Sequence, residues 1–201
     1  DTYSIGMSHL GIQILYGLLN ERKDTACERV FAPLDDMEAL MRKHKIPLFS
    51  LETYTPLKEF DIIGFSLQYE LSYTNILNMI DLAEIPVMAS ERGETEPLVI
   101  AGGPTAISPE PLADFIDLFL IGDGEESLPH LVELWKGMNQ KKLSRKEKIV
   151  SLAQTLKNAY APSLYEVMYH QDNTIQEIRP RISGLPSPIR SASVRDLNKT
   201  Y

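Results

Sequence analysis

Cysteine is scarce in this sequence, since Cys27 is the only one in 201 residues. A single cysteine excludes an internal disulfide and any zinc or iron–sulfur site built from clustered cysteines. A chain without disulfides is typical of a reducing compartment, so we expect a cytoplasmic protein. Long apolar runs are lacking as well. None approaches the ~18 residues that span a bilayer, so we expect no membrane partner.

Basic charge is also in short supply. The chain has 20 Lys and Arg residues against 28 Asp and Glu residues, which gives a net charge of −8 at pH 7. A general nucleic-acid surface needs clustered basic residues. The one basic cluster, KKLSRKEK at residues 141–148, is interrupted by Glu147 and indicates a solvated helix face. We therefore expect no general nucleic-acid binding.

What the sequence does contain is an alternation of apolar strands and amphipathic helices. Nearly continuous apolar runs predict strands that are buried on both faces of a sheet. Two further strands are predicted earlier in the chain, where the apolar runs are less continuous. This alternation indicates a flavodoxin-like, doubly wound parallel sheet with helices on both faces. The predicted strands are 28–32, 46–53, 61–68, 97–103 and the run that opens 117–126; the predicted helices are 7–19, 35–43, 72–83 and the segment after Gly124.

The first predicted helix carries Met7, Leu10, Ile14 and Leu18 at helical spacing, which indicates one buried face. Ser8 lies early enough in it to cap the first turn.

The last third of the chain has a different pattern. Residues 145–158 predict one helix, and the alternation on either side of Gln-Asp-Asn within 164–182 predicts a β-hairpin. The Pro- and Ser-rich stretch GLPSPIRSAS, residues 184–193, reads as an extended tether. We therefore divide the chain into an α/β domain at 1–140 and a unit at 141–201 that leads to a further domain.

Glycines recur at the ends of the predicted strands. Ligands of open α/β sheets bind at the carboxyl edge, where glycine lets the backbone approach them closely. Adjacent glycines are equally consistent with close packing of the strand end on a neighbouring element. The glycines in question are Gly64, Gly102, Gly103, Gly122 and Gly124.

Three short motifs carry a resemblance to a known family. DTYSIG, residues 1–6, resembles the Asp-x-His-x-x-Gly loop of cobalamin-binding domains, with Tyr3 where those domains have histidine. IGFSLQ at 63–68 and VIAGGPTA at 99–106 resemble the strand end and the glycine turn that border the cobalamin tail. Because that loop follows the first strand of such sheets, we expect a strand ahead of Asp1 in a longer parent protein.

The resemblance extends further along the chain. IGDGEE at 121–126 is similar to the strand end followed by Gly and Glu in cobalamin-binding domains that are fused to radical SAM enzymes. Over roughly residues 1–135 the sequence looks like the N-terminal region of an uncharacterised radical SAM family. This implies a radical SAM domain as partner in the same chain, with a 4Fe–4S cluster and S-adenosylmethionine, acting on an unknown substrate. The present residues would carry no radical chemistry themselves.

The resemblance also implies a site, but no catalytic residue and no metal ligand. Tyr3 is a neutral phenol and a poor ligand for cobalt, so cobalamin would be held base-off, without histidine ligation. His9 stands alone on the following helix and is expected to be structural. The implied cofactor-binding residues are Asp1, Tyr3, Gly6, Ser8, Ser66, Gly102, Gly103, Pro104 and Gly122.

Two other functions remain open from the sequence. The domain could be a cofactor-free scaffold that positions a substrate or a partner, with Asp1 closing a turn and Ser8 capping a helix. It could also be an unrelated nucleotide or flavin module. Against the latter, no phosphate-cradling loop opens the chain, and Gly122-Asp-Gly124 lacks the third glycine of a dinucleotide motif.

Overall fold

The computed structural model describes residues 1–196 and has a central sheet with strand order β1-β2-β3-β4. β1 (Ile62–Ser66), β2 (Leu98–Gly102) and β3 (Leu118–Leu120) are parallel, and β4 (Ala159–Tyr160) is antiparallel to β3. The α/β, flavodoxin-like fold predicted from the sequence is confirmed. Positions 197–201 of the expected second unit lie outside the described residues.

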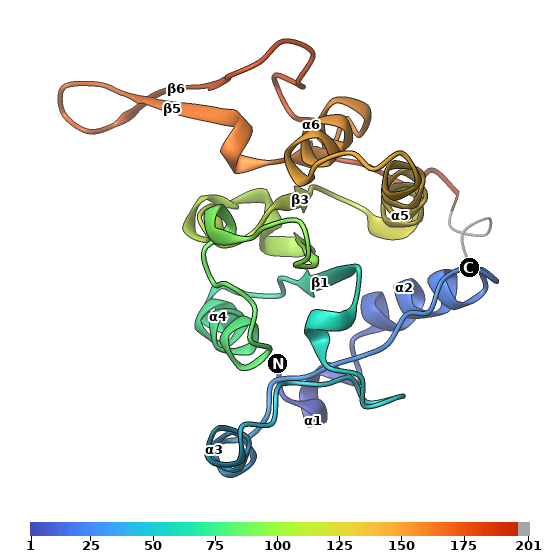
Figure 1. Cartoon of the computed structure of the whole chain (residues 1–201). Helices are drawn as coiled ribbons and strands as arrows, with labels where there is room; N and C mark the ends of the chain where they lie inside the picture. The colour runs from blue at the N-terminus through green and yellow to red at the C-terminus, as the bar shows by residue number, and fades with distance from the viewer. Residues whose placement is uncertain (197–201) are drawn as a thin grey trace.

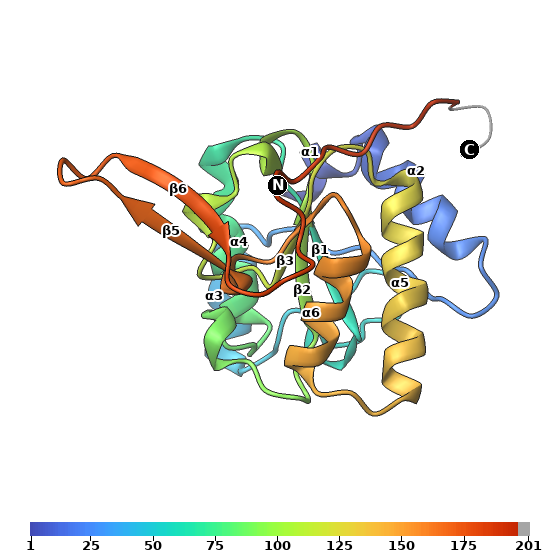
Figure 2. The ribbon, with the colours of Figure 1, turned by 90° about the horizontal axis from the view of Figure 1, so that it is seen from above.

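Helices cover both faces of this sheet (Figures 1 and 2). α4 (Tyr73–Leu82) lies on one face, and α2 (Leu10–Asn20) and α5 (Gly124–Gln140) pack together on the other. α6 (Arg145–Thr155) packs on α5 and β4. No helix in residues 1–196 has the length and apolar character needed to cross a membrane. The remaining helices are α1 (Tyr3–Gly6), α3 (Asp35–His44) and the one-turn 3-10 helices Leu57–Glu59, Glu70–Ser72, Ala89–Glu91, Pro104–Ile107, Glu110–Leu112 and Pro162–Leu164.

The core lies where these helices meet the two central strands. Leu98, Val99, Leu118 and Phe119 are fully buried, which explains why their strands read as continuous apolar runs rather than as an alternation. Residues after position 140 belong to the same core, as Leu152 on α6 shows.

Two of the predicted strands do not form. Residues 28–32 and 46–53 take part only in isolated bridges, Thr2 with Ala32 and Phe49 with Pro56. The backbone of the second segment instead closes a local turn, in which the amide of Ser50 donates to the carbonyl of Thr55 at 3.0 Å. Leu48 is part of the hydrophobic core, and Val30, Ala32 and Phe49 pack against it, so the apolar pattern reported burial here and not a paired strand.

The first predicted helix, 7–19, is not continuous with the loop before it. The chain forms two helices there, with α1 ending at Gly6 and α2 beginning at Leu10. Ser8 does not cap α2, because its hydroxyl donates back to the carbonyl of Ile5 at 2.9 Å and the N-cap of α2 is His9. Leu10 is 67% exposed and Met7 42% exposed, so this half of the predicted apolar face is not buried.

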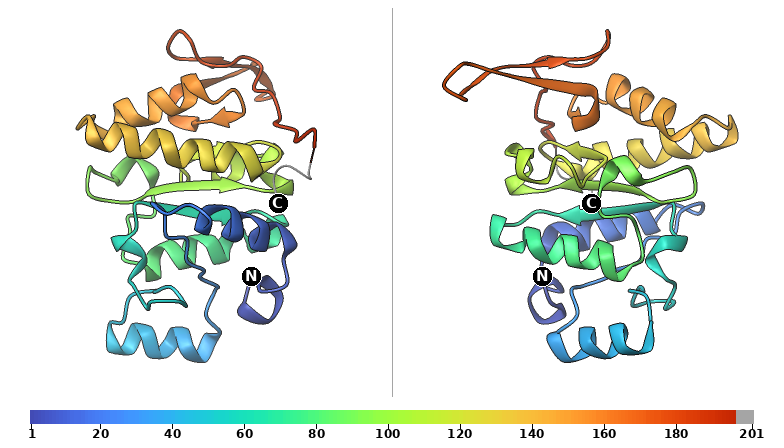
Figure 3. Two further views of the ribbon diagram at one scale, coloured as in Figure 1. Left: turned by 90° about the vertical axis from the view of Figure 1, so that its right-hand side faces the viewer. Right: turned by 60° about the vertical axis from the view of Figure 1, so that its left-hand side comes forward.

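The predicted hairpin is confirmed as β5 (Tyr165–Tyr169) and β6 (Ile175–Pro180), an antiparallel pair. It projects away from the rest of the fold (Figures 1 and 3). Tyr165 anchors its base, since the ring lies 5.1 Å from that of Tyr160 and the hydroxyl donates to the carbonyl of Pro186 at 2.8 Å.

Residues 184–193 were expected to form an extended tether, but this stretch lies on the domain (Figure 2). We name residues 184–196 the strap. The amide of Ala192 donates to the carbonyl of Ile121 at 2.9 Å, and its carbonyl accepts from the amide of Asp123 at 3.1 Å. Gly122 lies between them with φ 92°, and a Cβ atom at this position would be 2.2 Å from the carbonyl oxygen of Ala192. The strap therefore requires glycine at the carboxyl end of β3.

A buried charge cluster, formed by Arg92, Asp117 and Arg145, lies at the opposite end of the strands. One oxygen of Asp117, Oδ2, accepts from Arg92 Nη1 at 3.0 Å, from Arg145 Nη2 at 2.7 Å and from the amide of Val99 at 2.8 Å. The basic segment 141–148 is thus not only a solvated face, because Arg145 turns inward and is 7% exposed. The guanidinium groups also donate to the carbonyls of Pro86, Val87, Gly93, Glu96, Pro97 and Phe115.

Replacing the central carboxylate should destabilise the fold strongly. Asp117→Asn leaves two buried guanidinium groups without a counter-charge, and breaking a buried pair in this way costs about 3–5 kcal/mol. Chemical denaturation should show this loss in the free energy of unfolding. Glu166→Gln, which removes the exposed partner of Arg179, is the matched control and should cost about 1 kcal/mol or less. Equal losses in the two variants would contradict the structural role of the cluster.

Gly122→Ala should release the strap. The strained backbone and the contact with Ala192 should cost on the order of 1–3 kcal/mol, and trypsin should then cleave faster after Arg190 and Arg195. The control is Gly137→Ala on α5, where a Cβ would meet nothing within 4 Å. That change should stabilise the helix by about 0.5–1 kcal/mol and leave the cleavage rate unchanged. Faster cleavage in both variants would show that it does not report on the strap.

Candidate functional site at the carboxyl edge of the sheet

The structure gathers the first implied site residues around α1. Oδ2 of Asp1 lies 2.9 Å from Nε2 of His9, so these two side chains close the loop on each other. Tyr3 is 55% exposed, and its ring packs edge-on against Phe31 with centroids 5.5 Å apart. The phenol is therefore available at the surface, whereas Asp1 and His9 are engaged within the loop.

Gly6 is buried for a reason that involves no ligand. A Cβ atom at this position would lie 2.6 Å from two ring carbons of Phe31. The chain needs glycine here because the aromatic ring packs directly on the backbone. Ser8, with its hydroxyl bound to the carbonyl of Ile5, is exposed beside this loop.

A second group comes together where β1 and β2 end, since the register pairs Ser66 with Gly102. The amide of Leu67 donates to the carbonyl of Gly102 at 2.7 Å. Gly103 has φ 104°, and a Cβ there would lie 3.0 Å from the backbone nitrogen and oxygen of Leu67. Pro104 then opens a one-turn helix. The two glycines thus permit close approach of neighbouring chain segments.

The polar groups of this second region are few. The hydroxyl of Ser66 is exposed and accepts a hydrogen bond from the side-chain amide Nε2 of Gln68 at 2.6 Å. The hydroxyl of Tyr73 lies 3.2 Å from that of Thr105. Gly122 stands apart from both, because the strap lies on it. The implied site residues therefore form two groups at one edge of the sheet, and Gly122 is covered.

The main property of this edge, its exposed apolar surface, could not be recognised from the sequence. Large apolar side chains are exposed on α1, at the start of α2 and on the turns that follow β1 and β2, all of which lie at the same end of the strands (Figure 2). We name this set the apolar edge: Tyr3, Ile5, Met7, Leu10, Leu71 (82% exposed) and Ile107 (75% exposed). Such gatherings on a soluble domain mark interaction surfaces. The only sequence signal was the apolar residues in turns, which the helical pattern of Met7 and Leu10 concealed.

The edge is rich in apolar contacts and carries a pair of titratable side chains, Asp1 and His9. Among residues 1–196, no three His, Cys, Asp or Glu side chains converge in a way that could hold a metal ion. Cys27 lies away from this edge, bonded to Asn20 at the other end of α2, and burial with the nearby carboxylates of Glu52 and Glu28 raises the pKa of its thiol to about 11. A ligand or a partner at the edge would therefore meet apolar side chains, hydroxyls, backbone amides and the Asp1–His9 pair.

Comparison with known proteins supports the resemblance to radical SAM proteins that the sequence motifs indicated. The model of the N-terminal region of radical SAM proteins matches residues 11–162. A protein of Methanocaldococcus jannaschii, described as uncharacterised, is 33% identical over 129 residues, which are 63% of this chain and 23% of that protein. The chain thus spans about a quarter of the length of this relative. No solved structure matches the chain. The chain belongs to the family of N-terminal domains of radical SAM proteins.

Proposed function

We propose that this domain packs its apolar edge against the catalytic domain of a radical SAM protein and holds a corrinoid between the two. The observation that carries the proposal is the apolar edge itself. Leu71 and Ile107 are the most exposed of its large side chains, and they lie on the turns at which ligands of open α/β sheets bind. Exposing them to water is unfavourable unless another surface covers them.

Two further features support a domain partner in the same chain. The family describes the N-terminal part of longer proteins, and Cys27 is the only cysteine here, so the cysteines of an iron–sulfur cluster must come from elsewhere in the parent. The strap brings Val194 to the same end of the sheet, where its amide donates to Asp123 Oδ2 at 2.8 Å. A domain that follows the strap would therefore be attached beside the apolar edge.

What supports a corrinoid here is the position of the exposed Tyr3 and of the Gly102–Gly103 turn, which stand where cobalamin-binding domains have their loop and the turn that borders the cobalamin tail. Tyr3 would pack below the macrocycle, and Ser66 and the Gly102–Gly103 backbone would border it. When bound, the cofactor would supply cobalt-centred group transfer or radical chemistry. The residues of this chain would orient it and exclude water, and the phenol of Tyr3 would leave the cobalt without a nitrogen ligand from this loop.

A cofactor-free scaffold is the second candidate, and specific contacts favour it. Gly103 is packed on the backbone of Leu67, and Gly122 is covered by the strap. Both glycines thus have a packing role within the domain that requires no ligand. In this case the apolar edge would serve only to dock the catalytic domain or to position its substrate.

Titration with hydroxocobalamin separates the two candidates. We expect the full-length parent to retain one equivalent through gel filtration with a base-off visible spectrum. Tyr3→His should change that spectrum toward nitrogen ligation, whereas Tyr54→His, at an exposed tyrosine outside the apolar edge, should not. Retention by the parent but not by residues 1–201 would assign part of the site to the catalytic domain. If neither protein retains cobalamin, the corrinoid part of the proposal is wrong.

Docking of the edge has its own test. Leu71→Asp should leave the free energy of unfolding of residues 1–201 within about 0.5 kcal/mol, because the side chain makes few contacts there. In the full-length parent it should increase hydrogen exchange across the 69–72 turn and the facing domain. Tyr54→Asp is the matched control and should change neither. Unchanged exchange in the Leu71 variant would mean that this edge is not the interface.

A further inference from the structure

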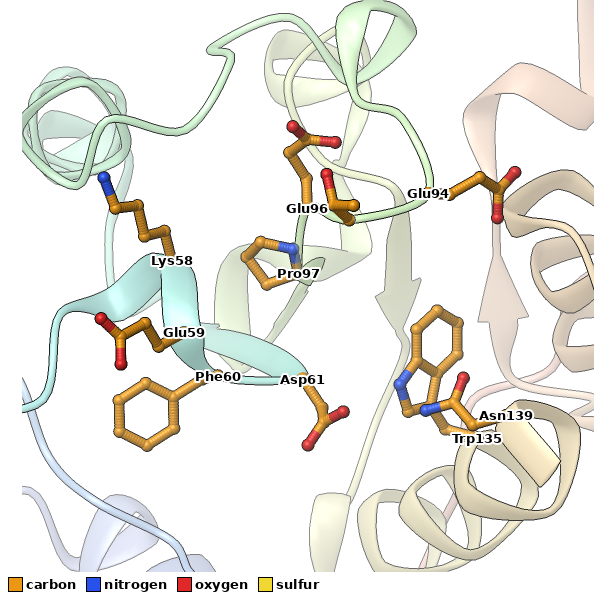
Figure 4. A pocket seen from close by; sticks show the side chains of 10 residues that line it. Lys58, Glu59, Phe60, Asp61, Glu94, Glu96, Pro97, Trp135 and Asn139 are labelled. Atoms are coloured by element: carbon orange, nitrogen blue, oxygen red, sulfur yellow. The ribbon is translucent and has the colours of Figure 1, made fainter. Parts of the chain in front are cut away.

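A separate cavity lies at the end of the strands opposite the apolar edge. This cavity of about 170 Å³ opens where the chain enters β1 and β2, between residues 58–61, residues 94–97 and α5 (Figure 4). None of the residues implied by the sequence analysis lines it. Its floor is the indole of Trp135 on α5 (Figure 4).

The indole has a hydrogen-bonding need that the protein leaves unmet. Trp135 is 5% exposed, and its Nε1 atom is buried without a hydrogen-bond partner in the described residues. The nitrogen lies on the edge of the ring that is turned toward Asp61 (Figure 4). A buried N–H without an acceptor costs about 1–3 kcal/mol. A ligand oxygen that accepts this N–H would therefore recover that free energy on binding. The ammonium group of Lys148, 4.8 Å from the ring centroid, holds the indole in place.

The walls of the cavity are acidic, but most of their charged groups are already engaged. Glu94 accepts from the amide of Arg145 at 2.8 Å, Glu96 accepts from that of Gly93 at 2.8 Å, and Lys58 is paired with Glu84. The carboxylates of Glu59 and Asp61 have no hydrogen-bond or ion-pair partner among residues 1–196. Glu59 points away from the indole, whereas Asp61 lies beside it, so Asp61 is the carboxylate placed to meet a positive charge next to Trp135 (Figure 4).

The carboxylates do not converge as a metal site would require, since no such cluster occurs in the described residues. A metal ion would also leave the indole N–H without an acceptor. An organic cation that carries an oxygen atom satisfies both groups at once. The volume admits roughly five or six non-hydrogen atoms, taking about 30 Å³ for each water-sized group.

We propose that this cavity binds a small primary ammonium compound with a hydroxyl or carbonyl oxygen. Its ammonium group pairs with Asp61, and its oxygen accepts the indole N–H of Trp135. The wall is preformed, because Arg145 donates to the carbonyls of Glu96 at 2.7 Å and Pro97 at 2.9 Å. The site is distant from the apolar edge and does not depend on corrinoid binding or on the docking of another domain.

Ethanolamine is the probe, and the indole signal is the readout. Trp135 is the only tryptophan, so the amide correlation spectrum of ¹⁵N-labelled residues 1–201 contains one indole N–H peak. Ethanolamine should shift this peak saturably, with a dissociation constant of about 1 mM for so small a ligand. Ethylamine, which lacks the oxygen, should bind at least about tenfold more weakly.

Asp61→Asn should weaken the ethanolamine response at least about fivefold at constant ionic strength. Glu177→Gln on the exposed hairpin is the control and should leave it unchanged, and circular dichroism verifies that both variants are folded. Lack of a saturable shift in the unmodified protein overturns the proposal. So does an equal response to ethylamine, or an equal response in the Asp61 and Glu177 variants, because each would mean nonspecific attraction of cations.

Discussion

The carboxylate of Asp117 is the constraint on which the rest of the architecture depends. The guanidinium groups of Arg92 and Arg145 reach it from segments far apart in the sequence, and it also accepts the amide of Val99 near the start of β2. Burying three charges is unfavourable unless every polar group is matched. Here backbone carbonyls match most of the guanidinium N–H groups, although Nε of Arg145 is buried without a partner in the described residues. These bonds tie the loops before β2 and β3 to the start of α6. The amino ends of the strands are therefore held firmly.

This arrangement gives the two ends of the sheet different physical characters. The amino end is polar, charged and cross-linked, and its loops are held to the core by Arg92 and Arg145. The carboxyl end exposes apolar side chains, and its turns are bonded to one another and to the strap through Leu67, Thr105 and Ala192. The proposed contact with another domain lies at this apolar end, whereas the cavity beside Trp135 lies at the charged end.

Much of the fold could be predicted from the sequence, because its signals are local. The runs that became β1, β2 and β3, the amphipathic helices and the hairpin all carry their own periodicity. Residues 28–32 and 46–53 have apolar composition too, but whether such a segment joins a sheet depends on what lies beside it. Arg92, Asp117 and Arg145 have no local signature at all, since only the folded chain brings them together.

The candidate site was predictable in part for the same reason. The glycines at strand ends were recognisable, but what lies against them was not. Gly6 faces a ring, Gly103 a neighbouring backbone and Gly122 the strap. Likewise, burial of Trp135 is consistent with its spacing from Leu131 on α5, whereas the lack of a partner for its nitrogen has no local sequence signal.

The strap has a mechanical consequence. Because Ala192 is bonded on both sides of Gly122, a pull on the residues that follow would be transmitted to the end of β3 and the start of α5, and not to the hairpin from which the strap departs. The hydrogen bonds would be loaded together along the strand direction, in shear. Movement of an attached domain would then reach the middle of the sheet directly, and the projecting hairpin would remain free of that load.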